Sequence, residues 1–483
     1  MRLFVSLFSS NGIYIDELEV LVQLVLATVF KTVGLHGNHV AGGFDSHALP
    51  PSIVSAFGQT VATETVKYRS NDPVNFDVDF SVPQRHRVRF TTDLAGRDFE
   101  VLTELIVAND NVSPPPKVLL VVDQGVADSA ATEQLVSRLN ASKQINVMDC
   151  SSVSVRKSTE ELALDERSND RHKASLAYFM MGGEICKNDT DDVEKILGLI
   201  NRFGFDRRSI IVAIGGGAML DTVGFAAATA HRGVRLIRVP TTTLAQADSG
   251  VGVKNAINYF NKKNWLGTFA VPWAVVNDQR LLDSLSDRDF CCGFSEAVKV
   301  ALLKSPEDFE FLCRNAARIR QREPDITFEA VKQSCLHHLK HITQGGDPFE
   351  TKEARPLDFG HWSAHKLESI TEYQIRHGEA VAIGVMLDCI YSLRVYDLPE
   401  NVVRKVGECF SELGLCLWCN ALDDADLILS GLEEFRQHLG GRLTITLLED
   451  VGKPIDVHEI DLAQMKNSIR DLDQWRRVLQ TQN

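Results

Sequence analysis

Three side chains in the second half of this 483-residue chain could together hold a metal ion. Glu296, His361 and His377 combine one carboxylate with two imidazoles, a donor set of catalytic zinc sites that leaves one position open for substrate oxygens. His365 follows His361 at spacing i, i+4 on a predicted helix, so an HxxxH pair competes with one ligand beside a hydrogen-bonding histidine. The spacing leaves both arrangements open.

A run of three glycines could bind a dinucleotide. Gly215, Gly216 and Gly217 follow the apolar segment 210–214, and Asp221 follows where a helix is predicted to begin. Backbone without side chains can approach a pyrophosphate near a helix N-terminus, although a tight turn would use the same glycines. The sequence therefore predicts either a cofactor loop or a structural turn.

Other polar residues have both a binding and a structural interpretation. Asp123 ends an apolar run, where a carboxylate can accept hydrogen bonds from ribose hydroxyls or cap a turn. Glu184 and Lys187 offer a hydroxyl acceptor and a cation. Several lysines and an asparagine recur beside glycines and carboxylates, and they either lie on the surface or line a pocket for a phosphorylated polyol. These residues are Lys254, Lys263, Asn264, Lys299 and Lys340.

The elements that must position these residues are of two types. Continuous apolar runs separated by segments of helical period indicate buried parallel strands in a βαβ domain. The runs occupy 118–123, 210–214 and 236–239. Alternating apolar residues in 76–80 and 88–90 predict antiparallel strands beside that sheet.

After about residue 280 amphipathic helical stretches dominate, for example 308–319, 328–342 and 379–395. We therefore expect an α/β N-terminal domain of nucleotide-binding, Rossmann-like type and an α-helical C-terminal domain, with a site in the cleft between them. The expected bounds are 1–65 for an N-terminal extension, 66–280 for the α/β domain and 281–483 for the helical domain.

Composition narrows the function classes. The chain is 44% hydrophobic and 24% charged, as in ordinary soluble proteins, and its formal net charge of -14 argues against a nucleic-acid partner. The apolar segment 20–30 follows acidic residues and is too short to span a bilayer, so we expect no membrane segment. Ten scattered cysteines favour a reducing, cytoplasmic environment, and Cys416 with Cys419 is read as packing rather than a metal or redox site.

Several motifs, taken in order, resemble one family. The segments 215–225, 231–233, 240–249, 263–267, 293–299, 359–361 and 377–381 are similar to those of 3-dehydroquinate synthases and related sugar phosphate cyclases. The resemblance extends from about residue 118 to 447. It implies a two-domain enzyme that cyclises a phosphorylated sugar with elimination of phosphate, a carbon–oxygen lyase reaction in which NAD is reduced and then reoxidised.

The resemblance also implies roles for individual residues. NAD would contact Asp123, Glu184, Lys187, Gly215, Gly216, Gly217, Asp221, Thr241, Thr242 and Lys263. Zinc would be held by Glu296, His361 and His377. Catalysis would involve Asp248, Lys299, Lys340 and His365. Substrate would be bound by Lys254, Asn264, Asp358 and Arg232, and Arg232 falls where the family reaches a phosphate across a homodimer interface.

The departures from the family pattern concern the substrate. Ala354 stands where dehydroquinate synthases carry an arginine for the substrate carboxylate, with Arg355 one place later, and Asp358 replaces an asparagine. A carboxylate at that position would repel an acidic substrate and accept hydrogen bonds from sugar hydroxyls. Asp358 therefore favours sedoheptulose 7-phosphate and a valiolone-type cyclitol product, as in one cyclase branch, whereas His365 resembles dehydroquinate synthases. The whole segment 345–365 resembles a separate, less characterised cyclase branch.

Three alternatives to a valiolone-type cyclase remain open from the sequence. They are a 3-dehydroquinate synthase, a metal-dependent polyol dehydrogenase of the glycerol dehydrogenase type, and a non-catalytic cyclase-like protein. The presence of all three predicted metal ligands and the glycine loop disfavours the last of these.

Overall fold

In the computed structural model the chain divides after Pro83, and the unit Gln84–Asn483 is distinct from Met1–Pro83. The predicted segment 20–30 and most of the predicted strand 76–80 lie outside the described residues. The structure describes residues 80–107, 114–151, 176–260, 262–345, 347–349, 356–438 and 441–482.

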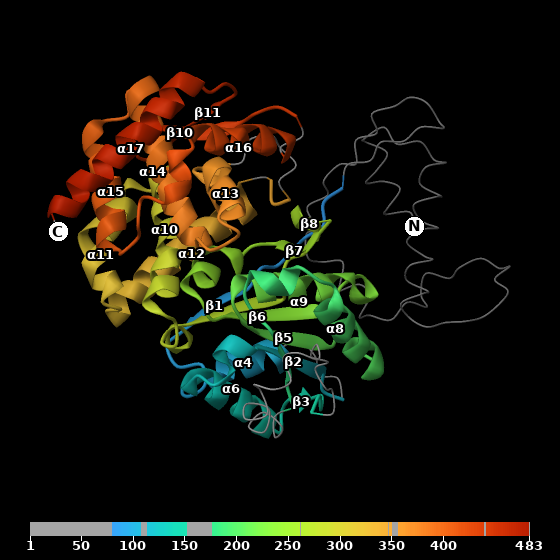
Figure 1. The fold of residues 1–483 in the computed structure, drawn as a ribbon. Coiled ribbons are helices and arrows are strands. Elements are labelled where there is room, and N and C mark those ends of the chain that lie inside the picture. Colours follow the sequence, from blue (N-terminus) through green and yellow to red (C-terminus); the bar gives the residue numbers. More distant parts are fainter. Residues whose placement is uncertain are drawn as a thin grey trace, which may run out of the picture. The chain divides into compact units, whose positions relative to one another are not determined.

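The first half of the unit is built on a parallel sheet (Figure 1). Within the described residues the sheet has seven strands in the order β1-β9-β6-β5-β2-β3, with β4 also paired to β2. Gly215 lies opposite Pro240, so that β5 and β6 end together at one edge. The strands are β1 (Val88–Thr91), β2 (Lys117–Asp123), β3 (Asn146–Val147), β4 (Tyr178–Met180), β5 (Ile210–Gly215), β6 (Arg235–Pro240) and β9 (Ala274–Asp278).

Helices cover both faces of this sheet. Leu120 of β2 packs in the core under α4 (Phe99–Val107) and α6 (Ala130–Ala141), whereas Leu119 packs under α8 and α9. Successive side chains of a strand point to opposite faces, and both faces are covered, which explains why the strands are continuous apolar runs. Helix α8 spans Asp191–Arg202 and α9 spans Gly217–Thr229. The three predicted parallel strands are confirmed.

The prediction of antiparallel strands beside the sheet is wrong for the described part. Strand β1 pairs in parallel with β9, which follows it in the sequence by more than 180 residues. Alternation within a strand indicates one buried face but not the direction of a distant partner. Antiparallel pairs occur instead in two hairpins that were not predicted, β7 (Lys254–Tyr259) with β8 (Lys262–Phe269) and β10 (Ile445–Asp450) with β11 (Lys453–Val457).

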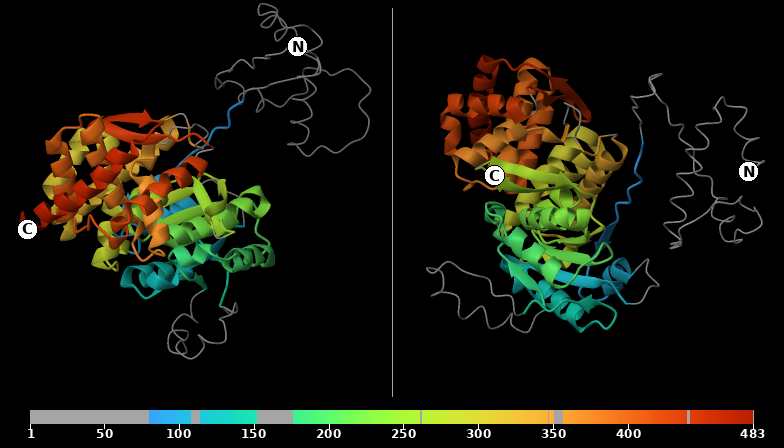
Figure 2. Two further views of the ribbon diagram at one scale, coloured as in Figure 1. Left: turned by 45° about the horizontal axis from the view of Figure 1, so that its top comes forward. Right: turned by 90° about the vertical axis from the view of Figure 1, so that its right-hand side faces the viewer.

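The second half of the unit is mainly helical, which confirms the predicted fold class. Figure 2 shows these helices, coloured yellow to red, packed along the α/β half, coloured blue to green. Helices α10 and α14 are buried along most of their length and lie at the centre of one large core. The helices are α10 (Asp287–Lys304), α11 (Pro306–Arg320), α12 (Pro324–Gln344), α13 (His361–Ile370), α14 (His377–Val395), α15 (Glu400–Glu412), α16 (Ala425–His438) and α17 (Leu462–Gln482).

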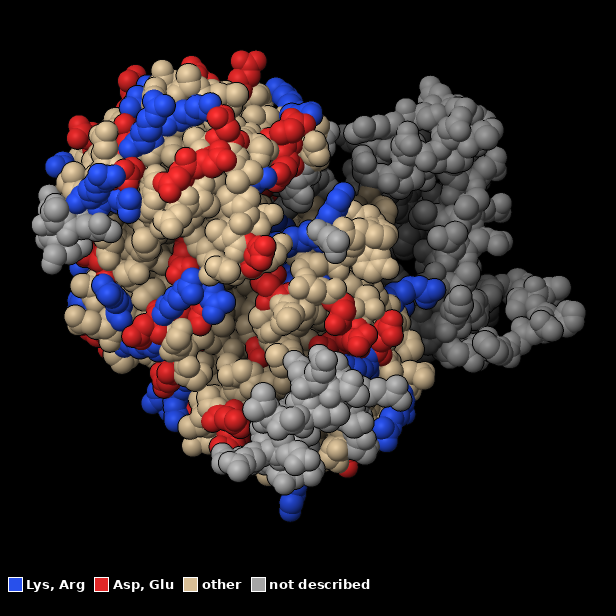
Figure 3. Space-filling model, in the orientation of Figure 1, with Lys and Arg blue, Asp and Glu red and all other residues tan. Residues whose placement is uncertain are grey.

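Charged side chains of both signs are interspersed over the face of the molecule in Figure 3, without a continuous basic surface among the described residues on that face. None of the helices in the described ranges has both the length and the apolar character needed to cross a bilayer.

Candidate active site

Three helices bring the predicted metal ligands together. Glu296 lies within α10, His361 is the first residue of α13 and His377 is the first residue of α14. Their ligand atoms lie within 4.8 Å of one another, and both Nε2 atoms are 3.4 Å from the same carboxylate oxygen, Glu296 Oε1. We call these three residues the metal cluster.

The local backbone structure fixes the positions of His361 and His377. Gly360 precedes His361 with φ 77°, a left-handed conformation that favours glycine and turns the chain into α13. The side chain of Glu379 accepts a hydrogen bond from the Arg376 backbone N–H at 2.8 Å and so caps the start of α14 beside His377.

The donor atoms of the metal cluster fit a divalent metal ion. Glu296 is fully buried, and neither of its carboxylate oxygens has a hydrogen bond of good geometry. His361 Nδ1 lies 3.1 Å from the Phe359 carbonyl oxygen and His377 Nδ1 lies 3.2 Å from Glu368 Oε2, so each ring can donate there and present Nε2 to a metal. A buried carboxylate aimed between two imidazoles is the arrangement that one zinc ion would satisfy.

Lys299 occupies the other side of Glu296. Its Nζ lies 2.5 Å from Glu296 Oε2 and donates to the carbonyl oxygen of Leu357 at 2.5 Å. Burial alone would raise the pKa of Glu296, but the Lys299 ammonium and the two imidazoles outweigh it and hold the pKa well below its usual range. Lys299 thus joins a residue of the metal cluster to the segment that carries Asp358.

An ion pair from the β7–β8 hairpin reaches the metal cluster from the α/β half. Lys263 Nζ lies 2.9 Å from Glu368 Oε1, and the other oxygen of Glu368 faces His377. Burial would lower the pKa of His377, but Glu368 and Glu296 outweigh it and raise that pKa to about 10. Glu368 was not predicted as a site residue, and Lys263, predicted to contact NAD, is paired with it.

Asp248 has a partner that the sequence did not single out. Asp248 Oδ1 lies 2.8 Å from Nε2 of His338 on α12, and both side chains lie close to Glu296. Asp248 belongs to a π-helical turn, Ala245–Ser249, a feature often found at functional sites. His338 could have been suspected only from its polar side chain on a buried helix face.

A buried arginine holds the backbone after this turn. Arg238 of β6 is fully buried and donates to the carbonyl oxygens of Ser249, Gly250, Gly252 and Lys254. These peptide oxygens are buried or partly buried and need a donor, so Arg238 fixes the path from Asp248 to the hairpin.

The glycine loop and Asp123 meet where strands β2 and β5 end. Asp123 is buried and accepts a hydrogen bond from the Gly125 N–H at 2.8 Å. Burial raises the pKa of Asp123, and the N–H groups of three glycines partly offset this. A Cβ on Gly215 would lie 2.9 Å from the Asp123 Cβ, and one on Gly217 would lie 2.5 Å from Ser249 Oγ. The loop is therefore a close-packed backbone cradle at the N-terminus of α9, which fits a pyrophosphate.

Other predicted NAD contacts lie at the same edge of the sheet. Lys187, in the short helix Glu184–Lys187 after β4, is buried and pairs with Asp221 of α9 at 2.7 Å. Glu184 Oε2, Thr241 Oγ1 and Ser249 Oγ are buried without hydrogen-bond partners. Unsatisfied polar atoms around a glycine cradle suit a ligand rich in hydroxyl and phosphate groups. Thr242 instead uses its hydroxyl to accept from the Ala245 N–H at 3.1 Å.

The other predicted residues lie around these two centres. His365 is exposed, with its ring 5.3 Å from that of His361 and 6.3 Å from that of His377, measured between centroids. Asp358 is half-buried in the turn Pro356–Asp358, whereas Ala354 and Arg355 lie outside the described residues. Four residues are exposed and their binding roles remain predictions: Lys254 and Asn264 on the hairpin, Lys340 on α12 and Arg232 after α9.

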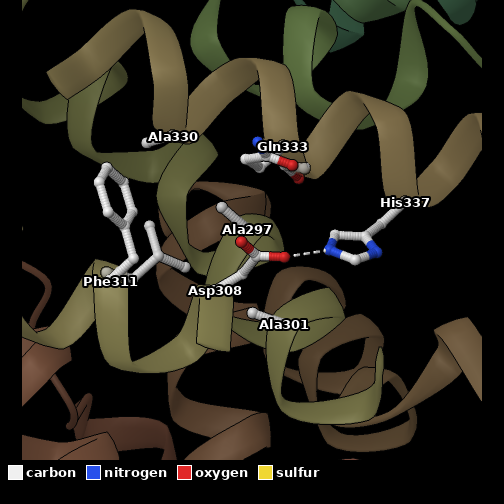
Figure 4. Close-up of a pocket in the computed structure, with 9 residues that line it drawn as sticks. Ala297, Ala301, Asp308, Phe311, Ala330, Gln333 and His337 are labelled. Atoms are coloured by element: carbon white, nitrogen blue, oxygen red, sulfur yellow. Dashed lines mark hydrogen bonds and ion pairs between the residues drawn. The ribbon is translucent and has the colours of Figure 1, made fainter. Parts of the chain in front are cut away.

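A small cavity elsewhere in the helical half contains a second histidine–carboxylate pair (Figure 4). His337 Nε2 lies 2.6 Å from Asp308 Oδ2 and joins α12 to α11. Ala297, Ala301 and Ala330 are among the other lining residues, and no predicted site residue lines the cavity. This pair therefore packs two helices, while the adjacent His338 faces Asp248.

Sequence comparison finds two matching family models. The model described as 3-dehydroquinate synthase N-terminal matches residues 177–292, and the one described as 3-dehydroquinate synthase C-terminal matches 293–433. The 3-dehydroquinate synthase of Acidithiobacillus ferrooxidans is 33% identical over 299 residues, which are 62% of this chain and 81% of that protein.

Structure comparison finds solved enzymes with a similar fold. A 2-epi-5-epi-valiolone synthase from Streptomyces hygroscopicus, solved with NAD+ and Zn2+, matches with a TM-score of 0.70 and 22% identity over 83% of this chain and 99% of that one. A 2-deoxy-scyllo-inosose synthase, solved with carbaglucose-6-phosphate, NAD+ and Co2+, matches with a TM-score of 0.63 and 24% identity over 80% and 96% of the two chains. At these identities the likeness concerns the fold.

Proposed function

The chain belongs to the 3-dehydroquinate synthase family, and from that premise we propose that it is a sugar phosphate cyclase that uses NAD and zinc. The observation that carries this proposal is the presence of two complementary centres in one compact unit. A glycine cradle with unsatisfied polar atoms lies at the sheet edge, and a buried carboxylate faces two imidazoles in the helical half.

The two cofactors would provide complementary chemistry. Bound NAD supplies a reversible hydride acceptor, and bound zinc supplies a Lewis acid for substrate hydroxyls. Glu296, His361 and His377 would hold the metal, while Glu368 and the Phe359 carbonyl would orient the two imidazoles. Asp248, held by His338, would accept hydrogen bonds or protons from the sugar.

For the substrate we propose a heptulose phosphate without a carboxylate, sedoheptulose 7-phosphate first, and a valiolone-type cyclitol as the product. Lys299 pairs with Glu296 of the metal cluster and donates to the carbonyl oxygen of Leu357, the residue before Asp358, which supports a role for Asp358 at the site. An anion at that position disfavours a substrate carboxylate and suits sugar hydroxyls. The exposed cations of Lys254 and Arg232 would balance the phosphate charge.

A second candidate is 3-dehydroquinate synthase activity. It is favoured by the Acidithiobacillus ferrooxidans relative, which is a 3-dehydroquinate synthase, and by His365, whose ring lies beside both metal-cluster histidines. The acidic substrate of that enzyme would require a cation that compensates Asp358.

Removal of single ligands tests the metal centre. We expect the Glu296→Ala, His361→Ala and His377→Ala variants to lose bound zinc and activity together, because each contributes one of the donor atoms. Zinc per chain is measured by elemental analysis after dialysis. His337→Ala is the matched control, since it removes a histidine of the same half that pairs with Asp308. Stoichiometric zinc in all three ligand variants would disprove the assignment.

A comparison of two substrates tests the choice of sugar. Purified protein with NAD and zinc is incubated with sedoheptulose 7-phosphate or 3-deoxy-D-arabino-heptulosonate 7-phosphate, and phosphate release and product mass are followed. We expect the neutral-headed sugar to react faster, and Asp358→Asn to slow it by roughly tenfold to a hundredfold, since a charge-assisted hydrogen bond contributes about 1.5–3 kcal/mol.

The same assay separates the alternatives. Faster turnover of the carboxylated sugar by the unmodified protein would identify a 3-dehydroquinate synthase. Accumulation of NADH in proportion to product would identify a polyol dehydrogenase, because a cyclase returns the hydride. Absence of both zinc and NAD after purification and reconstitution would support a non-catalytic protein.

We propose in addition that the protein acts as a homodimer. Arg232 is exposed, and it and His231 both have positive φ, 62° and 53°, in the turn that follows α9. An exposed cation held in such a turn could reach a phosphate bound by a second copy. Light scattering and an Arg232→Ala variant test this: we expect a dimer whose Michaelis constant rises on substitution.

A further inference from the structure

Asp388 is a buried carboxylate next to the metal cluster that no role assigned so far explains. It lies on α14, about three turns along the helix from His377, and its side chain is fully buried. Oδ2 accepts from the Gly360 backbone N–H at 2.9 Å, and Oδ1 accepts from the Trp362 indole Nε1–H at 2.9 Å. Among the described residues, no lysine or arginine forms an ion pair with it.

The two donors are the residues that flank His361. Gly360 and Trp362 precede and follow this ligand directly, and both are tied to the helix whose first residue is the other histidine ligand. The backbones are also in close contact, since a Cβ on Gly384 would lie 2.0 Å from the Gly360 carbonyl oxygen. The start of α13 therefore rests directly on α14.

Such a carboxylate is costly to bury. Burial raises the pKa of Asp388 to about 7, although the hydrogen bonds from Trp362 and Gly360 partly offset this. An apolar residue would fill the same core at lower cost, as it does at most buried positions of α14. The carboxylate provides what an apolar residue cannot: two directional hydrogen bonds that fix the chain on both sides of His361.

We propose that Asp388 is a positioning residue for the metal site, which holds the backbone around His361 so that its imidazole meets the same ion as His377 and Glu296. The inference rests on the proposed metal centre. Metal ligands tolerate only about 0.2 Å of error in distance, so a clamp on the neighbours of one ligand controls affinity. Replacement of a residue that supports a metal ligand typically lowers metal affinity by about 10- to 100-fold.

The test compares zinc affinity and cobalt spectra of full-length variants. Asp388→Asn keeps the volume but can offer only one carbonyl oxygen to the two donors. We expect its zinc dissociation constant, measured by chelator competition, to rise by about 10- to 100-fold, and the visible absorption of the Co2+ form to change in position or intensity. The spectrum reports ligand geometry and would not respond to a general loss of stability.

Two further variants serve as controls. Trp362→Phe keeps the carboxylate and removes one donor, so it separates positioning from charge; we expect a smaller shift in the same direction. Asp278→Asn alters another buried aspartate, which accepts from Thr91 and from the Leu94 N–H in the α/β half, and should lower stability without changing zinc affinity or the cobalt spectrum.

Each outcome decides the proposal. Unchanged zinc affinity and cobalt spectrum in Asp388→Asn, or in Trp362→Phe if the first variant does not fold, would overturn it. An equal loss of affinity in Asp278→Asn would also overturn it, because the effect would then be one of general stability. If the unmodified protein binds neither ion, the metal centre itself is refuted and the inference falls with it.

Discussion

At the scale of residues, Glu368 shows how a side chain outside the metal cluster can control it. Its two oxygens face different halves of the molecule, one toward Lys263 of the hairpin and the other toward His377. A carboxylate behind a metal-bound imidazole fixes the ring and increases its basicity. Lys263 neutralises part of that carboxylate, so a metal bound at His377 would be held more weakly because of the hairpin.

We predict that Glu368→Gln weakens zinc binding by about 10- to 100-fold, because the neutral amide polarises the His377 ring less. Lys263→Met should act in the opposite direction or have little effect, since it leaves Glu368 fully charged. Chelator competition measures both. Glu434→Gln is the control. Glu434 forms an ion pair at 2.5 Å with Lys366, which lies on α13 like Glu368, but Glu434 does not belong to the metal cluster. Wild-type affinity in Glu368→Gln would contradict the prediction.

Sequence reasoning at this scale identified the three residues of the metal cluster but not their neighbours. Glu296, His361 and His377 were recognisable because donor type and family motifs agree. His338 and Asp388 were not, because their partners are far away in the chain and each resembles an ordinary buried polar residue in a helix. Such pairings depend on how helices pack, which residue types and local spacing do not determine.

At the scale of elements, helix α14 is the support on which the metal cluster is assembled. It is apolar around most of its circumference, as expected for a helix at the centre of a domain. Gly384 allows the chain at Gly360 to lie against it, and Asp388 holds that chain in place. The precision of the cluster therefore depends on a glycine contact between the backbone of α14 and the turn that precedes α13.

We predict that Gly384→Ala lowers the free energy of unfolding by about 1–3 kcal/mol through overpacking, and that it also weakens zinc binding. The added methyl group would meet the Gly360 carbonyl oxygen at 2.0 Å. Gly198→Ala in α8 is the matched control, because a Cβ there has open space around it. That variant should gain up to about 1 kcal/mol from better helix propensity. Urea denaturation measures the stability of both variants and of the unmodified protein. A Gly384→Ala variant with the same urea midpoint as the unmodified protein would refute the prediction.

The secondary structure was predictable wherever the signal is local. The buried strands and the helices α11, α12 and α14 appear where they were expected, because apolar runs and helical periodicity are visible within short windows. The amphipathic character expected for 379–395 is wrong, because α14 is buried on nearly all sides. The parallel pairing of β1 and the two hairpins were missed. Strand β8 alternates mainly between exposed and half-buried residues, so it offers no clear apolar face to recognise.

At the scale of the whole molecule, the chain carries a net charge of -14 and yet has cations around its proposed site. Its ten cysteines all lie in the described part, where they are free thiols, and Cys416 is the exposed one among them. Burial raises the pKa of the Cys292 and Cys335 thiols to about 12. The thiolate is the reactive form of cysteine. These two thiols should therefore react slowly for two reasons: reagents cannot reach them, and their raised pKa leaves few of them ionised.

We predict that an aromatic disulfide reagent at pH 8 modifies one thiol rapidly in the native protein and all ten after unfolding. Cys416→Ser should remove the rapid phase without changing zinc content. The absorbance of the released thiol measures both. A rapid phase that persists in Cys416→Ser would contradict the assignment, as would rapid reaction of the buried thiols.

The hydrogen bond between Trp362 and Asp388 also has an optical consequence. Trp362 is 1% exposed, donates its indole N–H to a carboxylate and follows His361 directly in the chain. An indole buried among apolar side chains emits at shorter wavelength than an indole in water, and a Co2+ ion held close to it quenches that emission. Fluorescence at the blue edge of the tryptophan band should thus fall as Co2+ fills the metal cluster. The chain carries its own fluorescent reporter of metal occupancy, and Trp362→Phe, which keeps the other four tryptophans, supplies the reference that lacks this signal.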